Sequence, residues 1–130
     1  METTMSVPSG YSYTDTHEWV LFTSEGRARV GLTDYAQNAL GDIVYVNLCG
    51  EGEALEAGAG MGDVESIKTV SEIYSPLSGV VERINADVAD HPEFINQAPY
   101  ETWLVEMSGD FDGAALLTAP EYEKFLAGLE

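Results

Sequence analysis

Short runs in which apolar and polar residues alternate dominate the first half of the chain and predict β-strands. Residues 17–22 and 27–32 form two such runs, and the turn at 24–26 between them predicts a hairpin. Residues 43–48 predict a further strand, because they are rich in Val, Ile and Tyr. Residues 49–62 hold five glycines, so we expect turns there with short strand pieces.

The segment from 64 to 74 fits two periodicities. Its apolar residues recur every three positions, which could indicate a helix. Its Val, Ile and Thr content, its flanking glycine-rich and Pro-containing turns, and the strand expected at 80–84 favour strands instead. We therefore predict two strands that fold back around 66–68. This arrangement places Lys68 at a hairpin tip with its stem in solvent.

Helices are expected only at the margins of this pattern. Thr33 is a good N-cap and Gly41 a good C-terminal stop for a first helix. A single helical turn is expected within 91–96, with its apolar residues packed inward, and a late strand at 103–107. A final helix over about 118–129 begins with a capping-box pattern and an early proline. Its expected apolar face consists of Tyr122, Phe125, Leu126 and Leu129.

Together these elements predict a mostly β fold, a small sandwich or partly open barrel with short peripheral helices and a C-terminal helix. A chain of 130 residues suits one domain and leaves no room for two ordinary ones. We assign residues 11–130 to this domain. Residues 1–10 are polar with one proline and one glycine, and we expect a flexible N-terminal tail there.

The excess of acidic residues narrows the classes of partner. The chain has 23 acidic and 5 basic residues, and its formal net charge is -18. A surface of this kind repels phosphate backbones and anionic lipids, so we expect neither nucleic acid nor a membrane surface as partner. It suits soluble partners with basic docking faces.

Cysteine content and targeting signals limit the chemistry and the location. Cys49 is the only cysteine, so a disulfide within the chain, a CxxC pair and a cysteine metal cluster are all excluded. Any redox chemistry would have to come from an attached group. No apolar run approaches the length of a membrane span, and no leader pattern is visible. We expect a cytoplasmic monomer.

Lys68 is one of only two lysines and needs an explanation in so acidic a chain. It lies between Ile67 and Thr69, ahead of a Ser-Pro-Leu-Ser-Gly turn. The residues alone leave two interpretations open. A solvated surface lysine would offset nearby acids, whereas a lysine presented at a hairpin tip could be the attachment point of a prosthetic arm.

Six separated motifs bear on that choice. In chain order they are His17-Glu18-Trp19, Val30-Gly31-Leu32-Thr33-Asp34-Tyr35-Ala36-Gln37, Leu40-Gly41-Asp42, Val64-Glu65-Ser66-Ile67-Lys68, Ser75-Pro76-Leu77-Ser78-Gly79, and Ile95-Asn96 followed by Pro99-Tyr100. With them the chain, from about residue 13 to residue 129, resembles the H-protein of the glycine cleavage system. The resemblance implies a lipoyl-domain-like barrel-sandwich hybrid of two short sheets, with a lipoylated lysine at a hairpin turn.

The same resemblance implies lipoate, covalently attached to Lys68, as the cofactor. Biotin carriers resemble this domain but place the lysine between two methionines, which this chain does not. Glu65, three residues before the lysine, and Gly79, eleven residues after it, match the lipoyl pattern. The resemblance makes these two residues the expected recognition elements for the lipoylating enzyme.

The implied role is that of a non-catalytic carrier with four partner enzymes. A glycine decarboxylase with pyridoxal phosphate would load an aminomethyl group onto the lipoyl arm. A tetrahydrofolate-dependent aminomethyltransferase would take the one-carbon unit and release ammonia, and a dihydrolipoyl dehydrogenase with FAD would reoxidise the dithiol. A lipoylating enzyme would attach the arm.

A cleft that shelters the loaded arm from water is also implied by the resemblance. It carries over to Thr16, Glu18 and Glu72, and to the face of the first helix with Ala39 and Leu40. Carboxylates in such a cleft could bind the ammonium of the loaded arm. As residues, Glu18 and Glu72 could equally be plain surface acids.

The sequence leaves two other functions open. A similar protein could relay lipoyl groups to 2-oxoacid dehydrogenases or act as a carrier in sulfur oxidation, and an unmodified β-domain could serve only protein association. His17 invites a general-base interpretation, but its pattern contains no nucleophile. We therefore expect His17 to be a hydrogen-bonded strand residue.

Overall fold

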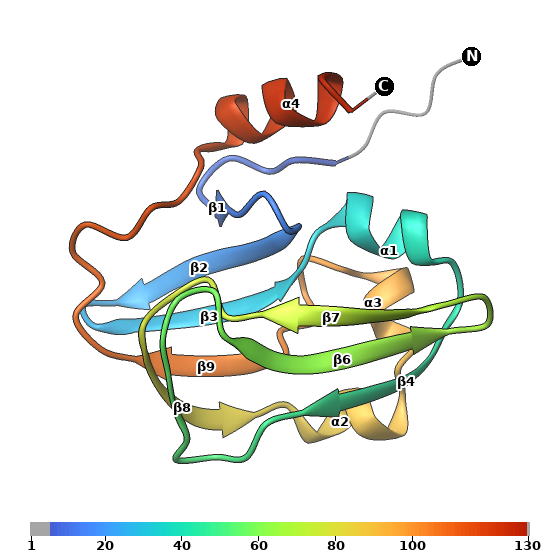
Figure 1. Ribbon diagram of the computed structural model, residues 1–130, viewed down its shortest axis with the longest axis horizontal. Helices are drawn as coiled ribbons and strands as arrows, with labels where there is room; N and C mark the ends of the chain where they lie inside the picture. The colour runs from blue at the N-terminus through green and yellow to red at the C-terminus, as the bar shows by residue number, and fades with distance from the viewer. Residues whose placement is uncertain (1–5, 130) are drawn as a thin grey trace.

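Nine strands and four helices are described in the computed structural model, which covers residues 6–129 in detail (Figure 1). The strands are β1 Ser12–Tyr13, β2 Glu18–Ser24, β3 Arg27–Leu32, β4 Ile43–Leu48, β5 Ala54–Leu55, β6 Gly60–Ser66, β7 Val70–Tyr74, β8 Gly79–Ile84 and β9 Val105–Ser108. The helices are α1 Asp34–Leu40, α2 Ala86–Asp90, α3 Phe94–Gln97 and α4 Ala119–Ala127.

The strands form two antiparallel sheets. One has six strands in the order β1-β2-β3-β9-β8-β5, and the other has three in the order β4-β6-β7. In Figure 1 the three-stranded sheet lies in front of the larger one, with α4 along the top. The predicted mostly β class with two short sheets and a C-terminal helix is confirmed. Within residues 6–129 no helix has both the length and the apolar content needed to cross a membrane.

Inward-facing side chains of both sheets form the main core. Val30, Val81 and Met107 come from the large sheet, and Val64 and Ile73 come from the small one, all at most 1% exposed. Alternate residues of a strand point to opposite faces, so the outward positions are more exposed, and those of the small sheet include the apolar or aromatic side chains of Val44, Tyr45 and Val70. This core packs the two sheets against each other and includes residues of the β2–β3 and β6–β7 hairpins.

Helix α1 begins and ends at the predicted residues. The Thr33 hydroxyl accepts the Ala36 amide at 3.2 Å, as an N-cap does. Gly41 adopts φ of +81°, which favours glycine, and its amide donates to the Gln37 carbonyl at 3.0 Å. The chain then turns directly into β4, and this sharp corner borders the predicted lysine hairpin.

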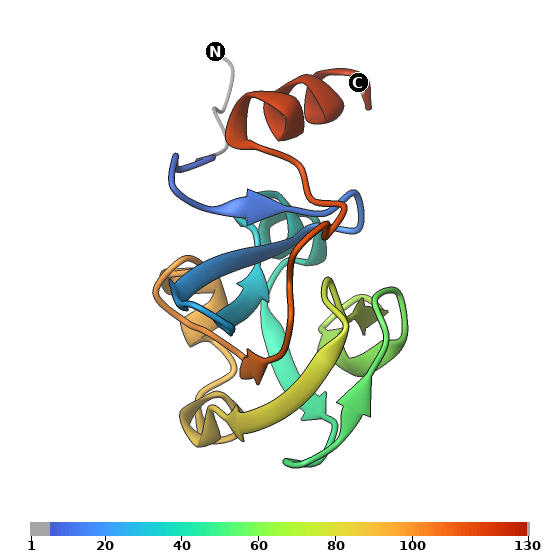
Figure 2. The same cartoon turned by 90° about the vertical axis from the view of Figure 1, so that its left-hand side faces the viewer.

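Helix α4 packs with the N-terminal strand in an aromatic cluster apart from the main core. The rings of Tyr13 and Tyr122 stack with their centroids 4.7 Å apart. The backbones of Tyr13 and Leu117 exchange two hydrogen bonds, of 2.8 and 2.7 Å. Figure 2 shows α4 beside this N-terminal segment. The first and last parts of the domain therefore hold each other in place.

Part of the predicted tail lies against the domain. The Ser6 amide donates to Asp34 Oδ2 at 2.9 Å, and the Tyr100 hydroxyl donates to the Ser6 carbonyl at 2.7 Å. The Pro8 carbonyl accepts from the Tyr13 hydroxyl. These bonds anchor residues 6–8, while residues 1–5 lie outside the described part and their predicted flexibility stays a prediction.

The region from 85 to 105 differs from its prediction. Helix α2, capped by the Asn85 side chain on the Asp87 amide at 3.2 Å, was not expected. The late strand begins at Val105 and not at residue 103. Trp103 lies before the strand, where its carbonyl accepts the side-chain amide of Asn85 at 2.7 Å and its ring faces the Arg29 and Arg83 guanidinium groups, 5.1 and 5.5 Å from its centroid.

Two predicted apolar contacts are weaker than expected. Phe94 is only half-buried, whereas its neighbour Ile95 is fully buried. Leu129 lies beyond the end of α4 and is 49% exposed, so it does not belong to the buried face of the helix. The helix is anchored instead by Tyr122, which is fully buried.

Candidate functional site

The predicted hairpin around Lys68 is confirmed. Strands β6 and β7 pair in antiparallel register, with Glu65 opposite Val70. Residues 66–69, here called the lysine turn, are closed by the Ser66 amide, which donates to the Thr69 carbonyl at 2.8 Å. The Ser66 hydroxyl oxygen also accepts the Lys68 and Thr69 amides, at 3.2 and 3.1 Å. The Lys68 side chain is exposed on this compact turn.

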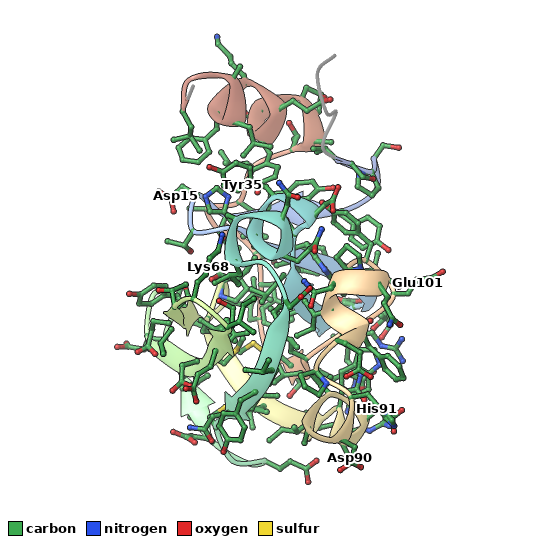
Figure 3. The ribbon with its side chains drawn as sticks, turned by 90° about the vertical axis from the view of Figure 1, so that its right-hand side faces the viewer. Asp15, Tyr35, Lys68, Asp90, His91 and Glu101 are labelled. Carbon is green, nitrogen blue, oxygen red and sulfur yellow. The ribbon has the colours of Figure 1, made fainter. Side chains whose placement is uncertain are left out.

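The lysine turn rests on residues 41–43, here called the α1–β4 corner. The Ile67 amide donates to the Asp42 carbonyl at 3.1 Å. A Cβ atom at Gly41 would lie 3.5 Å from Lys68 Cε, so the lysine stem passes along the corner. Figure 3 shows Lys68 on the side of the hairpin that faces α1. Lys68 is exposed at the hairpin tip as predicted, but its stem runs beside Gly41 and does not project straight into solvent.

The two predicted recognition residues lie in different places. Glu65 is half-buried in β6, between the exposed side chains of Tyr45 and Val70 on the adjacent strands. Gly79 begins β8, at the end of the molecule opposite the lysine turn (Figure 1). A Cβ atom at Gly79 would collide with the Ser108 carbonyl oxygen, so close packing of β8 on β9 explains the glycine.

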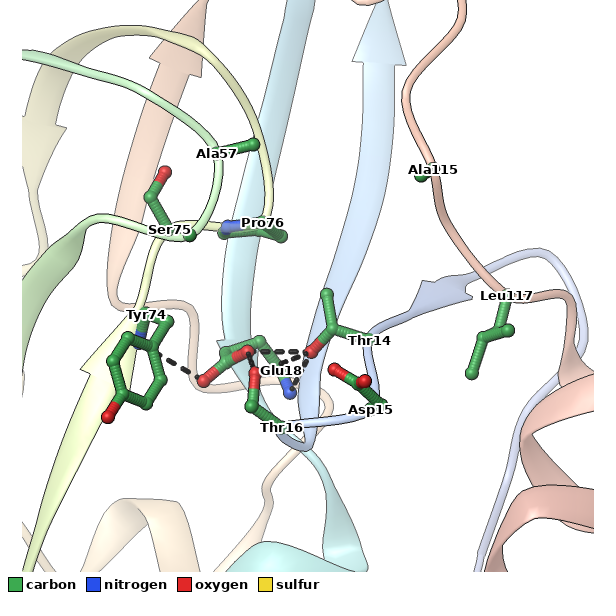
Figure 4. Close-up of a pocket in the computed structure, with 11 residues that line it drawn as sticks. Thr14, Asp15, Thr16, Glu18, Ala57, Tyr74, Ser75, Pro76, Ala115 and Leu117 are labelled. Carbon is green, nitrogen blue, oxygen red and sulfur yellow. Dashed lines mark hydrogen bonds between the residues drawn. The ribbon is translucent and has the colours of Figure 1, made fainter.

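Glu18 is a buried acid, and its interpretation as a plain surface acid is wrong. It is 1% exposed. Its Oε1 accepts the hydroxyls of Thr14, at 2.6 Å, and Thr16, and its Oε2 accepts the Tyr74 amide at 3.2 Å (Figure 4). Burial raises the pKa of Glu18 above its ordinary value, while these three hydrogen bonds lower it. The carboxyl group thus bridges the start of β2 to the end of β7.

An open pocket of about 620 Å³ lies over this carboxyl group. Its floor and mouth come from the loop before β2, the end of β7 and the segment that leads into α4 (Figure 4). The lining residues are Thr14, Asp15, Thr16, Glu18, Ala57, Gly58, Tyr74, Ser75, Pro76, Ala115 and Leu117. We call this the Glu18 pocket. Its walls from residues 57–58 and 115–117 carry no sequence signal that would have predicted them.

The other residues of the predicted cleft lie outside the lining of the Glu18 pocket. Glu72 is exposed on β7, with its Oε1 2.9 Å from where a Cβ of Gly60 would lie. Leu40 is buried and Ala39 is exposed at the end of α1, next to the α1–β4 corner. The structure therefore brings Thr16 and Glu18 together, while Ala39 and Leu40 lie at the end of α1, directly before the α1–β4 corner.

His17 is hydrogen-bonded as expected but is not part of a strand. It precedes β2 with φ of +73°, in the left-handed region. Its Nδ1 lies 2.7 Å from the Tyr122 hydroxyl, which also lies 2.8 Å from the Thr33 hydroxyl. Burial lowers the pKa of His17. This contact ties the loop that carries Thr16 to α4.

Comparison with known proteins assigns this arrangement to one family. Residues 11–128 match the family model described as glycine cleavage H-protein. The chain belongs to this family.

Curated relatives and a solved structure agree with the family assignment. The glycine cleavage system H protein of Lachnoclostridium phytofermentans is 47% identical over 122 residues, which are 94% of this chain and 96% of that protein. The protein of the same name from Bacillus subtilis is 46% identical over 123 residues, 92% of this chain and 96% of that protein. A crystal structure of a glycine cleavage system H protein from Mycobacterium marinum superposes with a TM-score of 0.86 at 40% identity, over 93% of this chain and 99% of that one.

Family membership confirms the resemblance drawn from the six motifs. The match to the family model covers residues 11–128, so it includes both the lysine turn and the Glu18 pocket. The comparisons favour glycine cleavage over a lipoyl relay in another pathway. Within residues 6–129, no three acidic, histidine or cysteine side chains gather as a metal site would require.

Proposed function

We propose that this chain carries lipoate in amide linkage on Lys68 and shuttles the aminomethyl group of glycine on that arm. As an H-protein it is the lipoyl carrier of the glycine cleavage system and not one of its catalysts. The observation that supports Lys68 as the attachment point is its exposed side chain on the lysine turn.

The surroundings of Lys68 suit acylation of its amine. Among residues 6–129 no carboxylate lies within 4.0 Å of the Lys68 ammonium, so no ion pair has to break before the amine can react. The backbone of the turn is held by Ser66 and by Asp42, while the side chain is free to enter an active site. Once attached, lipoate would supply a disulfide that is reduced when one sulfur takes the aminomethyl group, and the dithiol left after that group is passed on would be reoxidised to the disulfide by the FAD enzyme.

We assign recognition by the lipoylating enzyme to the outer face of β6 beside the turn. Glu65 is the charged residue of that face nearest to Lys68 along β6, flanked by the exposed side chains of Tyr45 and Val70. The contribution of Gly79 is indirect, because its close packing positions β8 and leaves no side chain to be read.

The Glu18 pocket is the proposed shelter for the end of the loaded arm. Glu18 and the Thr16 hydroxyl would face the ammonium of the aminomethyl group, and the exposed carboxylate of Glu72 would lie farther along β7. Charge-assisted hydrogen bonds of this kind contribute about 1.5–3 kcal/mol when partly buried. Ala39 and Leu40, beside the α1–β4 corner, would support the stem of the arm near its base.

The four partner enzymes follow from the carrier role. We propose glycine decarboxylase with pyridoxal phosphate, the tetrahydrofolate-dependent aminomethyltransferase, dihydrolipoyl dehydrogenase with FAD, and the lipoylating enzyme. A basic docking face on each would complement the net charge of -18. A cytoplasmic location and a monomeric state stay predictions.

Intact-mass spectrometry tests the attachment site. After incubation with lipoate, ATP and a lipoate ligase, the wild-type protein should gain the mass of one lipoyl group. The Lys68→Arg variant should gain none, because a guanidinium is not a substrate for acylation at neutral pH. The matched control is Lys124→Arg, which removes the only other lysine and should be modified like the wild type.

Two results would contradict the proposal. One is an unmodified wild-type protein under conditions in which the ligase modifies a known lipoyl domain. The other is a lipoyl mass that persists in Lys68→Arg. If the proposal holds, release of carbon dioxide from glycine by a glycine decarboxylase should require the lipoylated wild-type protein.

A further inference from the structure

The position of the lysine turn depends on the α1–β4 corner. Apart from the pairing of β6 with its neighbours, the turn is joined to the rest of the domain by the Ile67 amide on the Asp42 carbonyl, at 3.1 Å. The Ile67 side chain is 74% exposed, so its apolar contacts hold the turn only weakly. Beyond the pairing of Ser66 with Ile43, the bond to the Asp42 carbonyl therefore holds the turn on this side.

The side chain of Asn96, on α3, holds this corner from both ends. Its Nδ2 donates to the Gly41 carbonyl at 2.8 Å, and its Oδ1 accepts the Ile43 amide at 2.9 Å. Nδ2 also donates to Gln37 Oε1 at 3.1 Å. These bonds bracket Asp42, and they use both the donor and the acceptor of the amide group. Aspartate could keep the bond to Ile43 but would lose the donor to Gly41.

We infer that Asn96 is a positioning residue for Lys68, an inference that rests on the proposed attachment of lipoate there. Asn96 fixes the peptides on either side of Asp42, the Asp42 carbonyl holds the Ile67 amide, and the next residue along the chain is the lysine. None of the hydrogen bonds of Asn96 reaches Lys68 itself. It acts through the corner and sets where the lysine backbone lies when a partner enzyme approaches.

A preset turn lowers the entropy that is lost when the lipoylating enzyme binds. Without Asn96 the corner would keep its helix and strand, but the Gly41 carbonyl and the Ile43 amide would lose their protein partner. The Ile67–Asp42 hydrogen bond would then open more often, and the turn would sample more positions. The expected consequence is weaker binding of the turn by the lipoylating enzyme, with the chemical step unchanged.

The test compares Asn96→Ala with Asn85→Ala. Asn85 is the matched control because its side-chain amide, like that of Asn96, donates to a backbone carbonyl and accepts a backbone amide, here those of Trp103 and Asp87, away from the lysine turn. Three quantities are measured: the melting temperature, the hydrogen exchange rate of the Ile67 amide by NMR, and KM and kcat for lipoylation by a lipoate ligase. Asn96→Asp serves as a milder variant if Asn96→Ala does not fold.

Both alanine variants should lose melting temperature. Only Asn96→Ala should speed Ile67 amide exchange, by about 3- to 10-fold, the range expected for one weakened hydrogen bond. Its KM for lipoylation should rise by a similar factor with kcat unchanged, and Asn96→Asp should change both quantities in the same direction.

The inference is overturned if Asn96→Ala matches Asn85→Ala in Ile67 exchange and KM, because Asn96 would then be only a stabilising residue. It is also overturned if exchange changes and KM does not. Failure of the proposed function looks different, since the wild-type protein itself would then gain no lipoyl group on Lys68.

Discussion

The lysine turn and the Glu18 pocket differ in how they treat their charged side chain: the turn exposes Lys68, whereas the pocket buries Glu18. The lysine turn must offer a side chain to other proteins, and it does so with an exposed residue on a backbone held by short-range bonds within residues 66–69. The Glu18 pocket keeps a carboxyl group 1% exposed, held by hydroxyls from the preceding loop and by an amide 56 residues away.

This difference predicts how each region responds to change. A side chain that is already in water can be replaced with little effect on folding, so its substitution affects function alone. A buried acid with three donors aimed at it is part of the fold, so its substitution affects folding and function together. Measuring the free energy of unfolding and the lipoylation of Lys68 separately in each variant therefore distinguishes the two regions.

The largest effect on stability is expected for Glu18→Ala. It leaves the hydroxyls of Thr14 and Thr16 and the Tyr74 amide without their shared acceptor. The free energy of unfolding should fall by about 1–3 kcal/mol in urea titrations. Lipoylation of Lys68 should continue at the wild-type rate in the folded protein.

The control for this substitution is Glu72→Ala, which removes an exposed acid from β7. Its free energy of unfolding should stay within about 0.5 kcal/mol of the wild type. Equal losses in the two variants would show that the buried hydrogen bonds of Glu18 contribute nothing special to the fold.

A smaller effect is expected in the pH dependence of stability. Burial raises the pKa of Glu18, so the folded state binds its proton more tightly than the unfolded state does. The resulting stability is fully present below the unfolded pKa of about 4.3 and is lost as pH rises through the folded pKa. The free energy of unfolding of the wild type minus that of Glu18→Gln should fall across this range and then level off. A difference that does not vary with pH would contradict the raised pKa.

Salt should give the smallest effect and should act on the surface more than on the pocket. With 23 acidic and 5 basic residues, the folded chain repels itself, and added KCl screens this repulsion. The melting temperature should rise by a few degrees, while the apparent affinity for the glycine decarboxylase should weaken. An affinity that is constant over a broad range of KCl would argue against electrostatic docking.

Elements with local signals could be predicted from the sequence. The β-branched residues on either side of 66–68 predict the lysine hairpin, because the turn is closed by bonds between residues at most three apart. Thr33 and Gly41 define α1 for the same reason, and the Thr118 capping box defines the start of α4. In each case the residue that decides the local structure contacts backbone at most four residues away along the chain.

Features that depend on distant segments could not be predicted. Asn96 contacts residues 53 to 59 positions away, and no spacing along the chain reveals that it brackets Asp42. The burial of Glu18 requires the end of β7 to reach the start of β2. Trp103 is of a residue type common in strands, but its carbonyl bonds to the side chain of Asn85, 18 residues away, and this contact has no local signal in the sequence.

The pairing of Tyr13 with Leu117 and Tyr122 has a mechanical consequence. A pulling force applied to the two ends of the chain would load the hydrogen bonds of Ser6 and Pro8, and then these two backbone hydrogen bonds and the stacked rings, before it reached strands β2 to β9. The strands that carry the lysine lie between these contacts along the chain, so they would bear no tension until the contacts of Tyr13 with Leu117 and Tyr122 break. Single-molecule stretching should therefore show an early release of β1 and α4 before the remaining strands of the two sheets separate.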